Sequence, residues 1–139
     1  MQKRFMTFTA LNRRVLVITG PQGSGKSTLA RELAAVQGSY QTIHAHELDS
    51  YLAMGDVLCT EPETVIVDEG VPSSVSLRYV TEMILADKVQ CARRGQDPVL
   101  VNTPSFIFCT DSIDAIPLTS QDRRFVIEIN LPDGATKRR

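Results

Sequence analysis

Short apolar segments recur along the 139-residue chain and are separated by stretches of helical periodicity. Three of them, at residues 15–18, 64–67 and 105–109, are nearly continuous apolar runs, which are typical of strands buried on both faces of a sheet. Residues 42–48 and the alternating stretch 124–130 also predict strands. The pattern therefore supplies five candidate strands for one sheet.

Helices are predicted between these strands. Residues 28–36 bring Leu29, Leu33 and Val36 to one face, and Gly38 then ends the helix. Residues 50–58 predict a second, short helix.

The segment after the third strand predicts a helix followed by a hairpin. Residues 72–87 combine a proline and serine start signal with an apolar stripe. Residues 88–103 then predict two short strands joined by a turn at Gly95-Gln96-Asp97-Pro98.

Strands that alternate with helices predict an α/β domain of three layers around a mainly parallel five-stranded sheet. The length suits one domain over residues 1–139. We expect an N-terminal arm at 1–14, the core at 15–131 and a basic tail at 132–139.

Composition narrows the functional classes. The net charge of −1 argues against a protein that coats nucleic acid with its whole surface, but it leaves a local basic surface open. No apolar run approaches the roughly 20 residues of a membrane span, and the N-terminus lacks the apolar core of a signal peptide. We therefore expect a cytoplasmic protein without a membrane partner.

The cysteines and histidines do not predict a metal site or a disulfide framework. Cys59, Cys91 and Cys109 are odd in number and widely spaced, so buried thiols are the expectation. His44 and His46 lie two apart on a predicted strand and could share a face, but no third ligand stands near them.

The first chemical motif is "VITGPQGSGKSTLA", which starts at Val17. It contains the full pattern G-x-x-x-x-G-K-[ST], between a predicted strand and a predicted helix, and this combination is highly specific for a nucleotide phosphate loop. Glycines let backbone N–H groups turn toward phosphate oxygens, and the helix N-terminus favours anions. Lys26 should reach the β- and γ-phosphates of ATP, and the Ser27 hydroxyl should bind Mg²⁺. The predicted nucleotide-binding residues are Gly20, Pro21, Gln22, Gly23, Ser24, Gly25, Lys26, Ser27 and Thr28.

A second motif, "TVIVDE", ends a predicted strand on two carboxylates. We expect Asp68 to hold Mg²⁺ directly or through water, and Glu69 to polarise an attacking water as a general base. A strand-end acidic turn without chemistry is the alternative interpretation.

Two further strings carry polar groups next to predicted strands. "FIFCTDS" brings Thr110 and Asp111 to a strand end, where they could hydrogen-bond the γ-phosphate or the lytic water, or simply form the exit from the strand. "DRRF" places Arg123 and Arg124 before the last strand, either as solvated charge or as an arginine finger for the phosphate of a neighbouring subunit.

The ordered set "GPQGSGKS", "TVIVDE", "PSFIFCTDS" and "DRRF" resembles the ATPase core of superfamily 3 helicases, the AAA+ relatives found in replication initiators of small DNA viruses, phages and plasmids. The similarity covers roughly residues 15–131. It implies that Thr110 and Asp111 are sensor positions, although the sensor is often Asn, and that Arg123 or Arg124 is the finger.

The resemblance also implies a polymer partner. Residues 88–103 correspond to a basic hairpin that touches single-stranded DNA in a ring's central pore, and here they carry Lys88, Arg93 and Arg94. We therefore expect an ATPase with ATP and Mg²⁺ as cofactors, acting with single-stranded DNA or a DNA-replication protein, and able to form a homo-oligomeric ring. A stand-alone core of this kind suggests a phage-encoded accessory ATPase.

Two other functions fit the phosphate loop. A small-molecule kinase shares the loop and the size, but the segment between Ser73 and Thr103 holds no arginine-rich lid insertion. A binding module without hydrolysis would need ATP only to order a surface, and the intact Lys26, Asp68 and Glu69 argue against it.

Overall fold

The computed structural model describes residues 15–21, 23–68, 73–86, 88–111 and 126–131. Five strands form the main sheet in the order β2-β3-β6-β1-β7. All four neighbouring pairs are parallel. The strands are β1 (Val15–Thr19), β2 (Tyr40–Ile43), β3 (Thr64–Asp68), β6 (Ser105–Thr110) and β7 (Val126–Asn130). The predicted fold class is confirmed.

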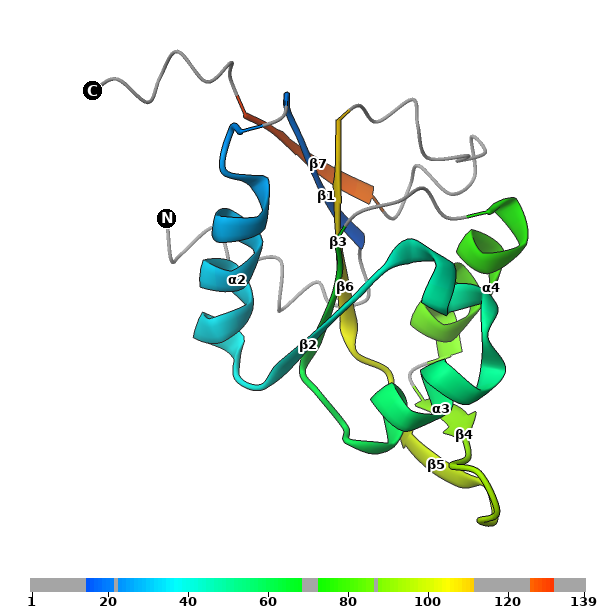
Figure 1. The fold of residues 1–139 in the computed structure, drawn as a ribbon. Coiled ribbons are helices and arrows are strands. Elements are labelled where there is room, and N and C mark those ends of the chain that lie inside the picture. Colours follow the sequence, from blue (N-terminus) through cyan, green and yellow to red (C-terminus); the bar gives the residue numbers. More distant parts are fainter. Residues whose placement is uncertain (1–14, 22, 69–72, 87, 112–125, 132–139) are drawn as a thin grey trace.

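Helices cover both faces of this sheet, as Figure 1 shows. Helix α2 (Lys26–Gln37) lies on one face, and α3 (Tyr51–Cys59) and α4 (Ser74–Ala86) lie on the other. Alternate residues of β1 divide between two cores: Leu16 and Ile18 pack with α2, whereas Val15 and Val17 pack with the α3 and α4 side. The strands are thus apolar on both faces, which is why they read as continuous apolar runs.

Most predicted helix boundaries hold to within two residues. Gly38 follows α2 with φ 142° and its N–H donates to the carbonyl of Ala34, so it ends this helix as expected. Ser73 begins α4, since its hydroxyl accepts from the N–H of Ser76 at 3.1 Å. One face prediction is wrong: Val36 is 55% exposed, whereas Leu33 is buried.

The strand predicted at 42–48 is wrong beyond Ile43. A 3₁₀ helix, η1 (Ala45–Asp49), replaces its second half. The backbone N–H of His44 donates to the Glu47 carboxylate at 2.8 Å, which caps this turn. Ala45 and Leu48 are both buried, and their spacing of three matches the 3₁₀ period rather than the strand period.

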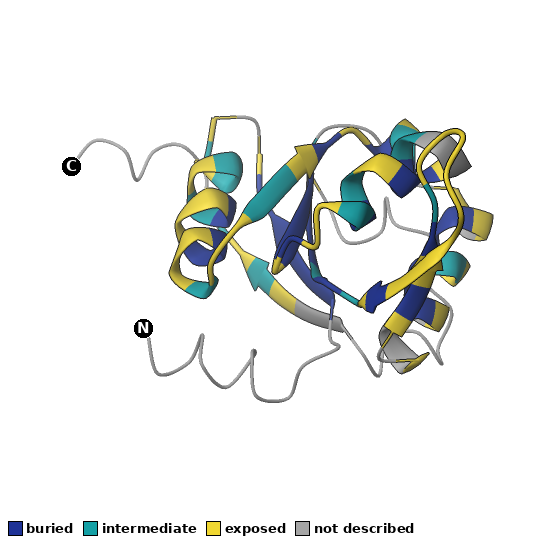
Figure 2. Cartoon of the chain, turned by 90° about the horizontal axis from the view of Figure 1, so that it is seen from below, coloured by how far each residue is buried: buried dark blue, intermediate teal, exposed yellow. Residues whose placement is uncertain are grey.

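The predicted hairpin is confirmed. Strands β4 (Lys88–Cys91) and β5 (Val99–Asn102) pair antiparallel as a separate two-stranded sheet. Since β5 ends three residues before β6 begins, the hairpin adjoins the amino end of β6. Figure 2 shows that its turn and the outer side of α2 are exposed, whereas the strands of the main sheet between the helices are mostly buried.

Candidate nucleotide site

The candidate site is built at the carboxyl edge of three neighbouring parallel strands. Thr19 is level with Thr110 across β1 and β6, and Asp68 is level with Cys109 across β3 and β6. The phosphate loop leaves β1 at this edge, and Asp111 follows β6 there. The register therefore brings the first three sequence motifs together.

The Lys26 side chain connects the phosphate loop to the residue that follows β6. Its ammonium donates to the carbonyls of Gly20 at 2.6 Å and Pro21 at 3.2 Å, and it pairs with the Asp111 carboxylate at 3.2 Å. The Lys26 side chain is only 14% exposed, whereas that of Asp111 is 77% exposed. A shielded cation is thus held at the loop by oxygen atoms, one of them on an exposed side chain that a phosphate could displace.

Ser27 and Asp68 form the second pair. The Ser27 hydroxyl donates to the Asp68 carboxylate at 2.8 Å, joining the first turn of α2 to the end of β3. A hydroxyl and a carboxylate are hard oxygen donors, which is the ligand type that Mg²⁺ prefers. These two residues therefore fit the metal role that the sequence assigned to them.

The phosphate loop itself has the conformation that its glycines permit. Gly23 and Gly25 have φ values of 82° and 94°, in the left-handed region that favours glycine. Space around Gly25 is open, since no heavy atom outside its neighbours lies within 4 Å of where a Cβ would stand. Among the described residues, the buried Ser24 hydroxyl has no hydrogen-bond partner. An open, glycine-lined turn with a spare donor beside a helix N-terminus fits an anionic ligand.

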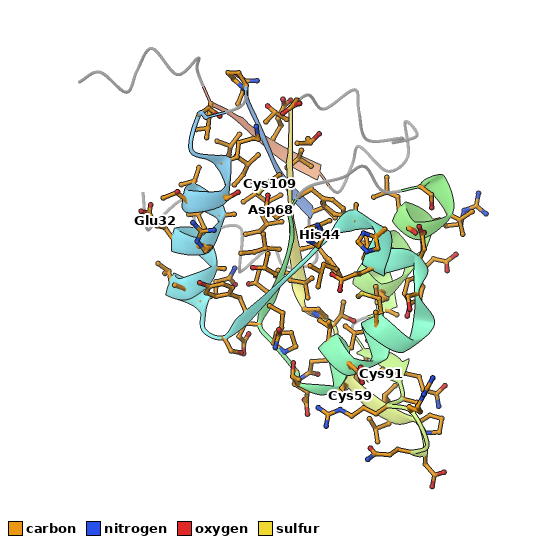
Figure 3. The ribbon with its side chains drawn as sticks, viewed as in Figure 1. Glu32, His44, Cys59, Asp68, Cys91 and Cys109 are labelled. Atoms are coloured by element: carbon orange, nitrogen blue, oxygen red, sulfur yellow. The ribbon has the colours of Figure 1, made fainter. Side chains whose placement is uncertain are left out.

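Cys109 contacts the first residue of α2, at the end of the phosphate loop. Its thiol lies 3.8 Å from the Lys26 carbonyl. Burial, and then the nearby Asp68 charge, raise the pKa of this thiol to about 12. Figure 3 labels Cys109 and Asp68 next to each other, and the two residues are paired at the carboxyl ends of β6 and β3. Cys109 is therefore a neutral packing group and not a nucleophile at physiological pH.

The fold was compared with solved structures. The NrS-1 C-terminal region superposes with a TM-score of 0.74 at 18% identity, over 97% of this chain and 34% of that one. The JCV helicase gives 0.64 at 17% identity, over 94% of this chain and 39% of that one. A RuvB mutant of Thermotoga maritima gives 0.58 at 18% identity, over 93% and 46%.

The chain therefore shares its fold with these solved structures, among them the JCV helicase and RuvB. The chain spans less than half the length of each of these three structures. No protein-family model matches the sequence, and no curated protein matches it. The resemblance seen in the motifs is thus confirmed for the fold.

The two positions that the motif resemblance implies as sensors differ in burial. Thr110 is nearly buried at the end of β6, whereas Asp111 is exposed and pairs with Lys26. A direct contact between Asp111 and the loop lysine was not part of the sequence prediction. It follows from the strand order, which sets β6 next to β1.

We expect Asp111→Asn to tighten ATP binding by about threefold to tenfold. In the wild type, the Lys26–Asp111 ion pair must break before Lys26 can hold a phosphate, and the Asp111 charge repels the phosphates. The substitution removes both effects. Because the carboxylate is exposed, the gain in binding free energy stays near ~1 kcal/mol. The dissociation constant from titration calorimetry at low salt checks this. Asp97→Asn, an exposed carboxylate of the hairpin turn, is the control, and unchanged or weaker binding by Asp111→Asn would count against the competition.

A second polar cluster, missed in the sequence, ties the last strand to the loop. The buried Thr19 hydroxyl donates to Glu128 at 3.0 Å and accepts from the Asn130 amide at 2.8 Å. The N–H of Leu131 donates to the Thr19 carbonyl at 2.7 Å. The entrance of the phosphate loop is therefore fixed by β7.

Four predicted site residues lie outside the described residues: Gln22, Glu69, Arg123 and Arg124. The arm at 1–14 and the tail at 132–139 also lie outside them. The roles of the four residues stay predictions.

His44 and His46 are not on a strand, contrary to expectation. Their rings stack with centroids 5.4 Å apart on either side of the start of η1. No group of three metal-ligating side chains gathers in the part of the chain that the structure describes. Of the helices described there, none has the length and apolar character to cross a membrane.

Proposed function

We propose that this protein is a Mg²⁺-dependent ATPase that acts on nucleic acid, as a helicase-like or replication accessory ATPase of phage or plasmid type working in the cytoplasm. The observation that carries the proposal is the convergence of Lys26, Ser27, Asp68 and Asp111 at one sheet edge, around a glycine loop at a helix N-terminus. Phosphate would engage Lys26 in place of Asp111, and its metal would engage Ser27 and Asp68. The helicases among the structural neighbours support the nucleic-acid part.

Each residue has a distinct role in this proposal. Lys26 leaves Asp111 and holds the β- and γ-phosphates, while the loop N–H groups and the α2 dipole add further positive potential. Ser27 and Asp68 hold Mg²⁺, which supplies neutralisation of phosphate charge when bound.

The hydrolytic step itself depends on groups at the strand ends. Glu69 takes a proton from the attacking water, and Thr110 and Asp111 orient that water or the γ-phosphate. Arg123 or Arg124 reaches the phosphate of a neighbouring subunit, so that a homo-oligomer completes each site.

The hairpin is the candidate contact for single-stranded DNA. Arg93 and Arg94 are exposed at its turn, where the N–H of Gln96 donates to the Arg93 carbonyl at 3.0 Å. Lys88 is exposed too but is engaged across the hairpin base, since its ammonium donates to Asn102 at 2.8 Å. Strand β6 joins the two regions: it begins beside the hairpin and ends at Thr110 and Asp111. A polymer held at the turn would thus be connected to the phosphate site through β5 and then β6.

We expect the Arg93→Ala/Arg94→Ala double variant to bind single-stranded DNA more weakly and with a shallower salt dependence. Each phosphate contact releases about 0.7 counterions, so losing two contacts lowers the slope by about 1.4. Fluorescence anisotropy over a series of salt concentrations measures both quantities. Arg31→Ala/Arg78→Ala removes the same charge from exposed positions on α2 and α4 and serves as the control. If both double variants bind alike, the contact lies elsewhere.

The proposed function is tested by phosphate release with and without single-stranded DNA over a range of protein concentrations. An assembling ATPase shows specific activity that rises with protein concentration or with DNA. A small-molecule kinase instead shows neither dependence and transfers phosphate only to an added acceptor. A non-hydrolytic binding module binds ATP and releases no phosphate.

A further inference from the structure

Two cysteines that are far apart in the sequence meet where α3 joins the hairpin. Cys59 is the last residue of α3 and Cys91 is the last residue of β4. Their Sγ atoms are 3.1 Å apart, and Figure 3 shows the two side chains together at the hairpin end of the molecule. A disulfide bond is about 2.0 Å long, so the two sulfurs are within about 1 Å of bonding distance.

The helix and the strand are held close by the backbone on either side of this pair. Gly55 of α3 faces Ala92 directly: a Cβ at Gly55 would stand 2.1 Å from the Ala92 carbonyl oxygen. Only a glycine allows this approach. Gly55 lies one turn before Cys59, and Ala92 directly follows Cys91. The sulfur contact therefore belongs to a tight packing of α3 on the turn end of β4 and is not a chance approach of two mobile side chains.

The two thiols differ in access. Cys91 is 2% exposed within the core beneath α3 and α4, whereas Cys59 is partly exposed at its margin. Burial raises the pKa of the Cys91 thiol to about 12, with the hydrogen bond to Cys59 adding to the effect. Cys91 is thus protonated at neutral pH, and Cys59 is the thiol that a reagent reaches first.

We propose that Cys59 and Cys91 form a reversible disulfide that locks the hairpin to α3. The oxidant is a small disulfide such as glutathione disulfide. The Cys59 thiolate attacks one of its sulfurs and expels one glutathione thiolate, leaving glutathione bonded to Cys59. Cys91 then gives up its proton to solvent, attacks the Cys59 sulfur and expels the second glutathione. Two thiols are oxidised and one small disulfide is reduced to two thiols, so electrons and protons balance.

The Cys59–Cys91 disulfide constrains the hairpin and leaves the proposed nucleotide site covalently unchanged. Arg93 follows Cys91 by two residues, so a bond at Cys91 fixes the base of the turn. Cys109 contacts Lys26 near the carboxyl end of β6, whereas the hairpin adjoins the amino end of this strand. Cys109 therefore remains a thiol. The inference stands on the sulfur contact and not on the proposed ATPase activity, and its test needs neither ATP nor DNA.

The experiment incubates the full chain with glutathione disulfide and maps peptides by mass under non-reducing conditions. We expect a peptide with Cys59 linked to one with Cys91, a loss of two hydrogen atoms in mass, a free Cys109 and full reversal by dithiothreitol. The closed loop should also raise the thermal midpoint by roughly 5 to 10 °C.

Two single variants serve as controls. Cys91→Ser should accumulate glutathione on Cys59 without the rise in thermal midpoint, and Cys59→Ser, at the more exposed position, should take up no glutathione while it remains folded. The proposal is overturned if wild-type protein keeps glutathione on Cys59, if Cys59 bridges two chains, or if neither thiol reacts in excess reagent.

Discussion

Lys26→Ala is expected to weaken ATP binding by at least about a hundredfold. The ammonium is the one side-chain cation of the described loop residues, and each charge-assisted hydrogen bond to phosphate contributes about 1.5 to 3 kcal/mol. Its removal also leaves the Asp111 carboxylate without the contact that now neutralises it, which adds repulsion toward the phosphates. Titration calorimetry with a non-hydrolysable ATP analogue and Mg²⁺ measures the loss.

Arg31→Ala provides the matched control, since it removes an exposed cation from the same helix, α2. Circular dichroism should show both variants folded, because the Lys26 hydrogen bonds are to the loop and not to the core. Binding by Lys26→Ala within a few fold of wild type would contradict the phosphate role of this lysine.

Loss of both Arg123 and Arg124 is expected to slow ATP hydrolysis by about 10³-fold to 10⁵-fold while leaving ATP binding nearly intact. That range is the usual effect of an arginine delivered to a neighbour's γ-phosphate. In the sequence the two residues precede β7 with one residue between, and Glu128 and Asn130 of β7 are hydrogen-bonded to Thr19 at the entrance of the phosphate loop.

Mixing two inactive proteins separates a finger that acts in trans from one that acts within a chain. Lys26→Ala lacks a nucleotide site but keeps its arginines, and Arg123→Ala/Arg124→Ala keeps the site without them. Phosphate release by the mixture should recover part of the wild-type rate. If light scattering shows that the two co-assemble and no activity returns, the trans-acting finger is excluded.

The geometry of the candidate nucleotide site could be predicted because its determinants are contiguous. The loop, the strand before it and the helix after it lie within one string, and local geometry alone fixes how Gly25, Lys26 and Ser27 face a phosphate. Asp68 could be placed with them because parallel strands bring their carboxyl ends to one edge.

Features that depend on the packing of distant segments were not predictable. The Thr19 cluster joins residues that are more than 100 positions apart, and the Cys59–Cys91 contact depends on how α3 settles on the hairpin. The strand predicted at 42–48 failed for a local reason. Ala45 and Leu48 are apolar at a spacing of three, and the His44–Glu47 cap, rather than hydrophobicity, selects a 3₁₀ turn there.

The most direct test of the central claim is phosphate release from ATP at saturating Mg²⁺ and single-stranded DNA, by wild-type protein and by Glu69→Gln. The variant keeps the Lys26, Ser27 and Asp68 contacts and loses only the carboxylate that polarises water, an effect of about 10² to 10⁴ in rate. The account predicts steady release by the wild type, and a Glu69→Gln protein that binds ATP normally and releases phosphate at least about a hundredfold more slowly. No release by the wild type under any of these conditions, or equal rates for the two proteins, would contradict it.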